Sequence, residues 1–148
     1  MGLFDALGIS GSGLTAQRLR MDVTSENLAS AQSTRGANGQ PYRRKEVVLQ
    51  EAQGDGGFGG VLNGAMGAGS AAGAGVEVGG IVEDRSPGRR VYDPGNPDAD
   101  RTGYVTLPNV NPVTEMVDLI DSSRAYEANV TAMQSAKQMF SKTLDLLK

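Results

Sequence analysis

Apolar side chains recur at alternating steps of three and four residues from about residue 112 to the end of the chain. This is the pattern of a helix with one apolar seam. Asn111 can cap such a helix and Pro112 suits its first position, so we predict a helix over residues 111–148. In heptads, the first seam position holds Met116, Ser123, Val130, Lys137 and Leu144, and the fourth holds Leu119, Tyr126, Met133, Phe140 and Leu147.

A weaker repeat of the same kind runs through the first 36 residues and predicts a second amphipathic helix. Three glycines, Gly8, Gly11 and Gly13, lower its helix propensity, so we expect a soft or bent region there. The polar run 33–39 predicts its end. The seam positions of this helix, spaced by seven, are Leu7, Leu14, Met21 and Leu28.

Between the helices the pattern changes to period two, which predicts short strands at 44–50 and 75–83 and a third through 90–92. Turns are predicted at 86–88 and 93–98. Residues 54–75 hold ten Gly and five Ala with almost no charge, and we predict a flexible loop there. The expected fold class is α+β, with terminal helices over 1–36 and 111–148 paired as a coiled-coil-like core around a β-rich insert, 37–110.

The two seams together carry more apolar surface than one pair of helices would bury, which favours packing against neighbouring copies. A head-to-tail contact that does not close builds an open helical filament. The sequence therefore predicts polymerisation. An ordinary helical hairpin folded onto a monomeric β domain is the alternative that amphipathicity leaves open.

Composition narrows the possible chemistry. The chain has no Cys and no His, which excludes disulfides, thiolate and imidazole metal sites, Cys nucleophiles and His-based triads. Its net charge of -3 argues against nucleic-acid binding, and no apolar run reaches the length of a membrane span. We expect a protein that is not an enzyme and that has no cofactor and no metal.

Three local patterns match known functional motifs, but the sequence around each one argues against that function. Residues 11–16 fit the dinucleotide fingerprint, but the preceding segment is predicted to be helical and the expected βαβ unit is missing. The aspartates at 93, 98 and 100 lack the spacing of an EF-hand and suit turns. The basic residues 43–45 are typical of a solvated strand end. If they have a function, we expect it to be an interface with an acidic neighbour.

Several stretches resemble the flagellar rod and hook proteins. Residues 10–17 followed by 25–31 are similar to the N-terminal signature of that family, with Asn27, Leu28 and Ala29 at its centre and Ser30 in place of the usual second Asn. The stretches 80–84, 91–100, 103–105, 108–111 and 115–129 also match, so the resemblance covers nearly everything except 54–75. A further stretch, 39–45, is closer to the proximal rod members than to distal rod or hook members, and it contains Pro41, Tyr42, Arg43, Arg44 and Lys45.

The resemblance implies an uncleaved subunit that is exported by the flagellar type III apparatus and assembled into the proximal rod, where the rod crosses the periplasm and transmits torque. It implies as partners copies of the chain itself, other proximal and distal rod subunits, the adaptor protein at the rod base and the membrane ring beneath it. The alternatives are another axial protein of distal rod or hook type, or a helical interaction module outside the flagellum.

Overall fold

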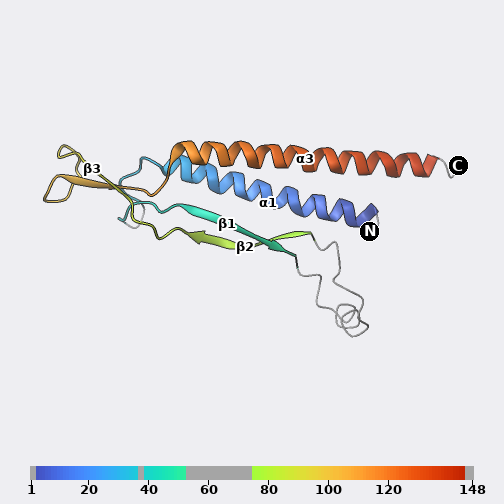
Figure 1. Cartoon of the computed structure of the whole chain (residues 1–148), viewed down its shortest axis with the longest axis horizontal. Coiled ribbons are helices and arrows are strands. Elements are labelled where there is room, and N and C mark those ends of the chain that lie inside the picture. Colours follow the sequence, from blue (N-terminus) through green and yellow to red (C-terminus); the bar gives the residue numbers. More distant parts are fainter. Residues whose placement is uncertain (1–2, 37–38, 53–74, 146–148) are drawn as a thin grey trace, which may run out of the picture. The chain divides into compact units, whose positions relative to one another are not determined.

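Two long helices, one before and one after four short strands in the sequence, make up the computed structural model, which describes residues 3–36, 39–52 and 75–145 (Figure 1). The predicted α+β class, with terminal helices and a small β-rich insert, is confirmed. The elements in chain order are α1 (Leu3–Ser30), β1 (Lys45–Glu51), β2 (Val76–Glu83), β3 (Arg89–Tyr92), β4 (Tyr104–Leu107) and α3 (Pro112–Asp145).

The chain divides into two compact units. One unit combines residues 1–18, 49–79 and 124–148, and the other combines 19–48 and 80–123. Each contains part of α1, of α3 and of the strands β1 and β2, while β3 and β4 belong wholly to the second. The stretch predicted to be a flexible loop, 54–75, lies outside the described residues except for Gly75.

Both helices begin and continue for reasons that the sequence makes visible. The side chain of Asn111 accepts a hydrogen bond from the amide of Val113 at 3.1 Å, and Pro112 occupies the first helical position, as predicted. Helix α1 is helical without a break from Leu3 to Ser30, through the glycines of its first half. The hydroxyl of Thr24 donates to the carbonyl of Arg20, so this polar side chain is satisfied within the helix.

β1 and β2 form a two-stranded sheet. The amide of Asp84 donates to the carbonyl of Arg44 at one end, and the amide of Ala52 donates to the carbonyl of Gly75 at the other, which makes the pair antiparallel. The steps between these bonds number 52 − 44 = 8 along β1 and 84 − 75 = 9 along β2, so β2 carries one extra residue. Gly80 in β2 has φ +151°, a backbone conformation that residues other than glycine rarely adopt.

β3 and β4 form a separate antiparallel hairpin, in which Val91 lies opposite Val105 and Tyr92 opposite Tyr104. The sequence predicted the first of these strands but not the second, which has the same length and follows a run of turn residues. Val105 is buried, whereas both tyrosines are exposed.

The core is small. Its buried apolar side chains are Ala16, Val23, Ala31, Val105 and Ala136, and the largest fully buried side chains are polar: Glu115, Asn27 and Ser122. Large apolar side chains lie on the surface instead, above all on α3. This is the reverse of the usual distribution in a monomeric globular protein.

Candidate functional site

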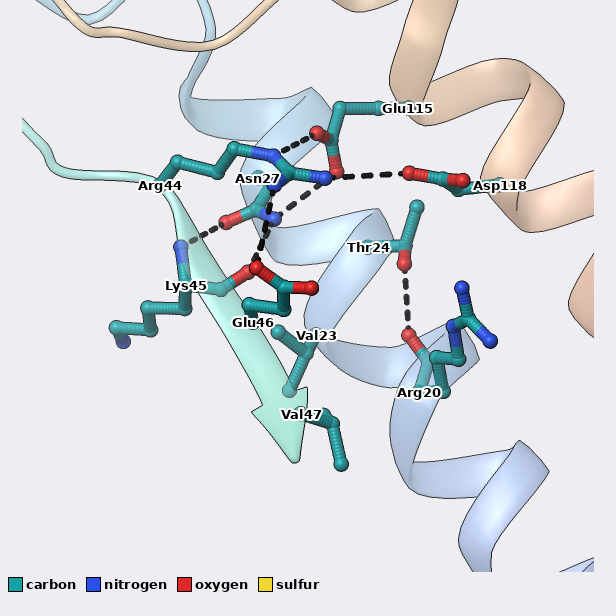
Figure 2. Close-up of a pocket in the computed structure, with 10 residues that line it drawn as sticks. All are labelled: Arg20, Val23, Thr24, Asn27, Arg44, Lys45, Glu46, Val47, Glu115 and Asp118. Atoms are coloured by element: carbon teal, nitrogen blue, oxygen red, sulfur yellow. Dashed lines mark hydrogen bonds and ion pairs between the residues drawn. The ribbon is translucent and has the colours of Figure 1, made fainter. Parts of the chain in front are cut away.

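A buried polar junction ties α1, β1 and the start of α3 together in the unit that contains them (Figure 2). Asn27 projects from α1 and Glu115 from the first turn of α3, and each has only 1% of its surface exposed. Arg44 reaches them from the residue just before β1. Three segments that are far apart in the sequence therefore share one set of hydrogen bonds.

Asn27 uses every hydrogen-bonding position of its side chain. Its amide nitrogen donates to the carbonyl of Lys45 at 2.8 Å and to Glu115 Oε2 at 2.9 Å. Its amide oxygen accepts from the backbone amide of Lys45 and from the hydroxyl of Tyr42, both at 2.9 Å. A side chain with two donors and two acceptors in this arrangement is required, and among the amino acids only Asn supplies it at this length.

Arg44 balances the buried carboxylate. Its Nε donates to Glu115 Oε1 at 2.6 Å and its Nη2 to Asp118 Oδ2 at 3.2 Å, while Nη1 lies 3.7 Å from Glu46. The Glu115 bond raises the pKa of Arg44 above its usual value. A buried carboxylate is tolerated when it is paired and hydrogen-bonded, and both conditions hold here.

The backbone around Arg44 is fixed as well. Its amide donates to Asn109 Oδ1 at 2.8 Å, and the amide nitrogen of Asn109 donates to the carbonyl of Asp84 at 3.2 Å. The strands and the segment before α3 are thereby joined at the point where the guanidinium enters the junction.

Tyr42 and Lys45 also take part in the junction. Lys45 Nζ lies 2.6 Å from Glu26 Oε1 and 5.5 Å from the centre of the Tyr42 ring. Burial, followed by the negative charges of Glu26, Glu115 and Glu83, raises the pKa of Tyr42 to about 12, so its hydroxyl stays protonated and donates to Asn27.

The recess above this junction has a volume of about 230 Å³ and is lined by residues of α1, β1 and α3. Its carboxylates are engaged by Arg44 and Asn27, and the chain has no His or Cys to act there. Among residues 3–36, 39–52 and 75–145, no group of three or more acidic residues is placed to hold a metal ion. The arrangement suits fastening segments together rather than acting on a substrate.

In the other unit the two helices approach closely over small side chains. A Cβ added at Gly13 would lie 3.1 Å from the side-chain nitrogen of Asn129, and one added at Gly11 would lie 3.8 Å from Met133 Cε. The hydroxyl of Ser12 also accepts a hydrogen bond from the amide of Val76 at 3.0 Å, which fastens the start of β2 to α1. Of the three glycines that weaken α1 as an isolated helix, Gly13 is thus the one that permits the close approach of α3.

The structure distributes the predicted seam residues over half-buried and exposed positions. Those half-buried are Leu7, Leu14, Met21, Leu28, Leu119, Tyr126, Val130 and Met133; those exposed are Met116, Phe140 and Leu144; Leu147 lies outside the described residues. Their role in assembly stays a prediction. Among the residues of the family resemblance, Asn27 is buried, Leu28, Pro41, Tyr42, Arg44 and Lys45 are half-buried, and Ala29 and Arg43 are exposed.

Sequence reasoning missed the positions that α3 buries most. Glu115, Ser122 and Ala136 are buried and Asn129 is half-buried, and all four are separated by multiples of seven residues. They are small or polar, so a search for large apolar residues passes over them. A second seven-residue repeat, made of small and polar residues, runs beside the apolar repeat and could have identified them. Glu115 and Asp118, which stand among apolar neighbours, were a further signal.

Neither described helix contains a segment long and apolar enough to cross a membrane.

Comparisons with known proteins point to one family. Residues 101–146 match the family model for the C-terminal region of flagellar basal body rod FlgEFG proteins. The flagellar basal-body rod protein FlgC of Bacillus subtilis (strain 168) is 51% identical, with full coverage of both chains. The FlgC proteins of Escherichia coli O157:H7 and of Borreliella burgdorferi are 45% and 43% identical, over 99% and 100% of this chain and 98% and 99% of theirs.

Proposed function

Because this chain belongs to the FlgC family of flagellar basal-body rod proteins, we propose that it polymerises through its terminal helices into the proximal part of the rod and transmits torque there. Members of this family are structural subunits of the basal body and are not enzymes. The chain therefore functions as a building block of the rod.

The observation that carries the polymerisation proposal is the inverted distribution of side chains. Small and polar residues fill the contacts inside the chain, while Val113, Met116, Val117 and Ile120 of α3 are each more than half exposed. Exposed apolar surface is costly in water, and a contiguous patch of it marks a surface that another molecule covers. The fold of one copy is thus completed by its neighbours.

Torque transmission follows from the way the insert is fastened. A shear force applied to the β insert passes into both helices through the bonds of Asn27 and Arg44. Many short bonds that connect three segments resist sliding better than a single contact would, because each must break for the segments to move. Within its unit, the polar junction is the point at which α1, β1 and α3 are fastened to one another.

As a family member the chain assembles with other rod subunits. We further propose that its neighbours are copies of itself, the other proximal rod subunits and the distal rod subunits, with the adaptor protein at the rod base and the membrane ring beneath. Delivery by the flagellar type III export apparatus belongs to the same proposal.

Deletion of the gene followed by imaging of isolated basal bodies tests this function. We expect basal bodies that lack the rod, and recovery of rods and motility when the wild-type chain is restored. Complete rods in the deletion strain would refute the proposal.

Two matched variants test whether the exposed face of α3 contributes. Val117→Asp places a charge on the exposed apolar face, and Thr114→Asp places the same charge on an exposed, non-apolar position of the same helix. We expect Val117→Asp to abolish rod assembly and Thr114→Asp to support it, because only the first buries an unpaired charge in a contact between subunits. Equal motility of the two strains would contradict the assembly role of this face.

A further inference from the structure

One side of α3 carries a continuous apolar surface at its start, which we call the α3 outer stripe: Val113, Met116, Val117 and Ile120. Their spacing of three and four residues puts them on one face of the helix, and they are between 51% and 70% exposed. The acidic residues of the same stretch, Glu115 and Asp118, point the other way, to Arg44. This helix segment therefore turns its charges toward its own chain and its apolar side chains toward solvent.

The exposed area of the α3 outer stripe indicates which kind of complex it can support. Its exposed area is on the order of 400 Å², the range in which a surface patch marks an interaction site. A stable isolated complex buries about 800 Å² on each partner, roughly twice as much. The stripe is therefore suited to one contact among several in an assembly rather than to an isolated dimer.

The same unit carries a second exposed surface, on the β3–β4 hairpin. Tyr92 and Tyr104 are 63% and 41% exposed and pack edge to face, with ring centres 5.3 Å apart. Arg90 lies 5.0 Å over the Tyr104 ring and 2.8 Å from Asp100. We call Arg90, Tyr92, Tyr104 and the exposed Thr106, which lie on one face of the hairpin, the hairpin face.

The residue types of the hairpin face, and the contacts among them, make it well suited to bind another protein surface. Tyrosine and arginine are the residues that most often dominate the energy of protein interfaces. Their mutual contacts, and the bond from Arg90 to Asp100, restrict these side chains before binding, which lowers the entropy lost when a partner binds.

The two surfaces are chemically complementary. Aliphatic and methionine side chains pack favourably on tyrosine rings. Asp121, one residue after Ile120, is exposed and has no side-chain hydrogen bond or ion pair within the described part of the chain, and the same is true of Arg89 and Arg101 at the two ends of the hairpin. An acid that borders one surface and basic residues that border the other would orient the contact.

We infer that the α3 outer stripe binds the hairpin face of a second copy of this chain. The inference rests on the proposed function and names the partner surface. A second copy is the occupant because it brings the complementary surface with it, and because the stripe is too small to hold a partner alone. When each copy presents its hairpin to one neighbour and receives the hairpin of another, the contact is head-to-tail and can repeat along an open assembly.

The absence of cysteine makes disulfide cross-linking a clean test. Two differently tagged versions of the full chain, Val117→Cys and Thr106→Cys, are produced together in cells that lack their own copy. Isolated basal bodies are oxidised and analysed without reductant. In the control, Asp22→Cys, on the exposed side of α1, replaces Val117→Cys. If the Val117→Cys chain fails to enter rods, Thr114→Cys, which leaves the stripe intact, takes its place.

We expect the mixed dimer of Val117→Cys and Thr106→Cys to form several-fold more than the mixed dimer of the control. A yield no higher than that of the control overturns the inference, as does a prevailing dimer of two Val117→Cys chains, which would place α3 against α3. Rods that contain neither tag would refute the proposed function. Rods that contain both tags without the mixed dimer refute this inference alone.

Discussion

Arg44→Met should destabilise the unit that contains the polar junction. The substitution keeps an unbranched side chain, shorter by two atoms, but removes the cation that faces Glu115 at 2.6 Å and Asp118 at 3.2 Å. Breaking a buried ion pair by removing one partner costs about 3–5 kcal/mol, because a charge is left buried without its counterion. Glu115 is 1% exposed but Arg44 is 25% exposed, so part of the interaction is screened and we expect about 2–3 kcal/mol.

Urea unfolding of the purified chain, followed by circular dichroism, measures this loss. A change of about 2–3 kcal/mol corresponds to a roughly 30- to 150-fold shift in the unfolding equilibrium. Arg43→Met is the matched control, since Arg43 is the neighbouring, exposed arginine and makes no ion pair within the described residues. Identical unfolding midpoints for the Arg43→Met and Arg44→Met chains would refute the reasoning.

A double variant separates charge from packing. In Arg44→Met combined with Glu115→Gln, the buried negative charge is removed and the glutamine oxygen still accepts from Asn27. We expect the double variant to be more stable than Arg44→Met alone by at least about 1 kcal/mol, because the two residues are coupled. A double variant less stable than either single one would show that the charge is not what the arginine compensates.

Three further perturbations follow from local geometry. Gly8→Ala should raise the free energy of unfolding by up to about 1 kcal/mol, because alanine favours the helix and the added methyl meets no atom within 4 Å. Gly13→Val should lower the free energy of unfolding by about 1–3 kcal/mol, because its Cβ would lie 3.1 Å from the Asn129 side chain. Hydrogen bonds from Thr102 and from the amide of Tyr104 lower the pKa of Asp100 to about 2, below its unfolded value of about 4, so its stabilising effect is present above pH 4 and is lost as the pH falls toward 2. Near-ultraviolet dichroism of the hairpin tyrosines should follow that loss, and Asp100→Asn should remove it. Truncation from Lys137 onward should abolish rod assembly and leave the β insert folded, as checked by basal-body imaging and by limited proteolysis of the purified chain.

Periodicity predicted the helices well because their caps and repeats are local. Asn111 and Pro112 identify the start of α3 without any knowledge of the rest of the chain. Strand β4 was not predicted, since it follows a long run of turn residues and its pairing with β3 is not visible in its own four residues. The extra residue of β2 relative to β1 depends on the pairing of the two strands and is equally invisible to a search for local patterns.

The polar junction could be predicted only in part. The resemblance to rod and hook proteins drew attention to Asn27 and to residues 41–45, but nothing in their spacing shows that they meet Glu115, which is 88 residues from Asn27 in the sequence. Glu115 fits the first turn of a helix so well, through its favourable interaction with the helix dipole, that its other role is concealed. A contact over such a separation is a property of the folded chain, and the local pattern holds no record of it.

The small interior described above has a kinetic consequence. A subunit whose large apolar side chains face outward gains much of its stability from neighbours, so its helices become firmer as more contacts form around them. The first copies that associate gain the least stability, because each has few neighbours. Each copy that is added later binds to a surface formed by several subunits. Growth should therefore show a concentration threshold and a lag that preformed ends abolish, which means that the place where assembly begins can be controlled by whatever supplies the first such end.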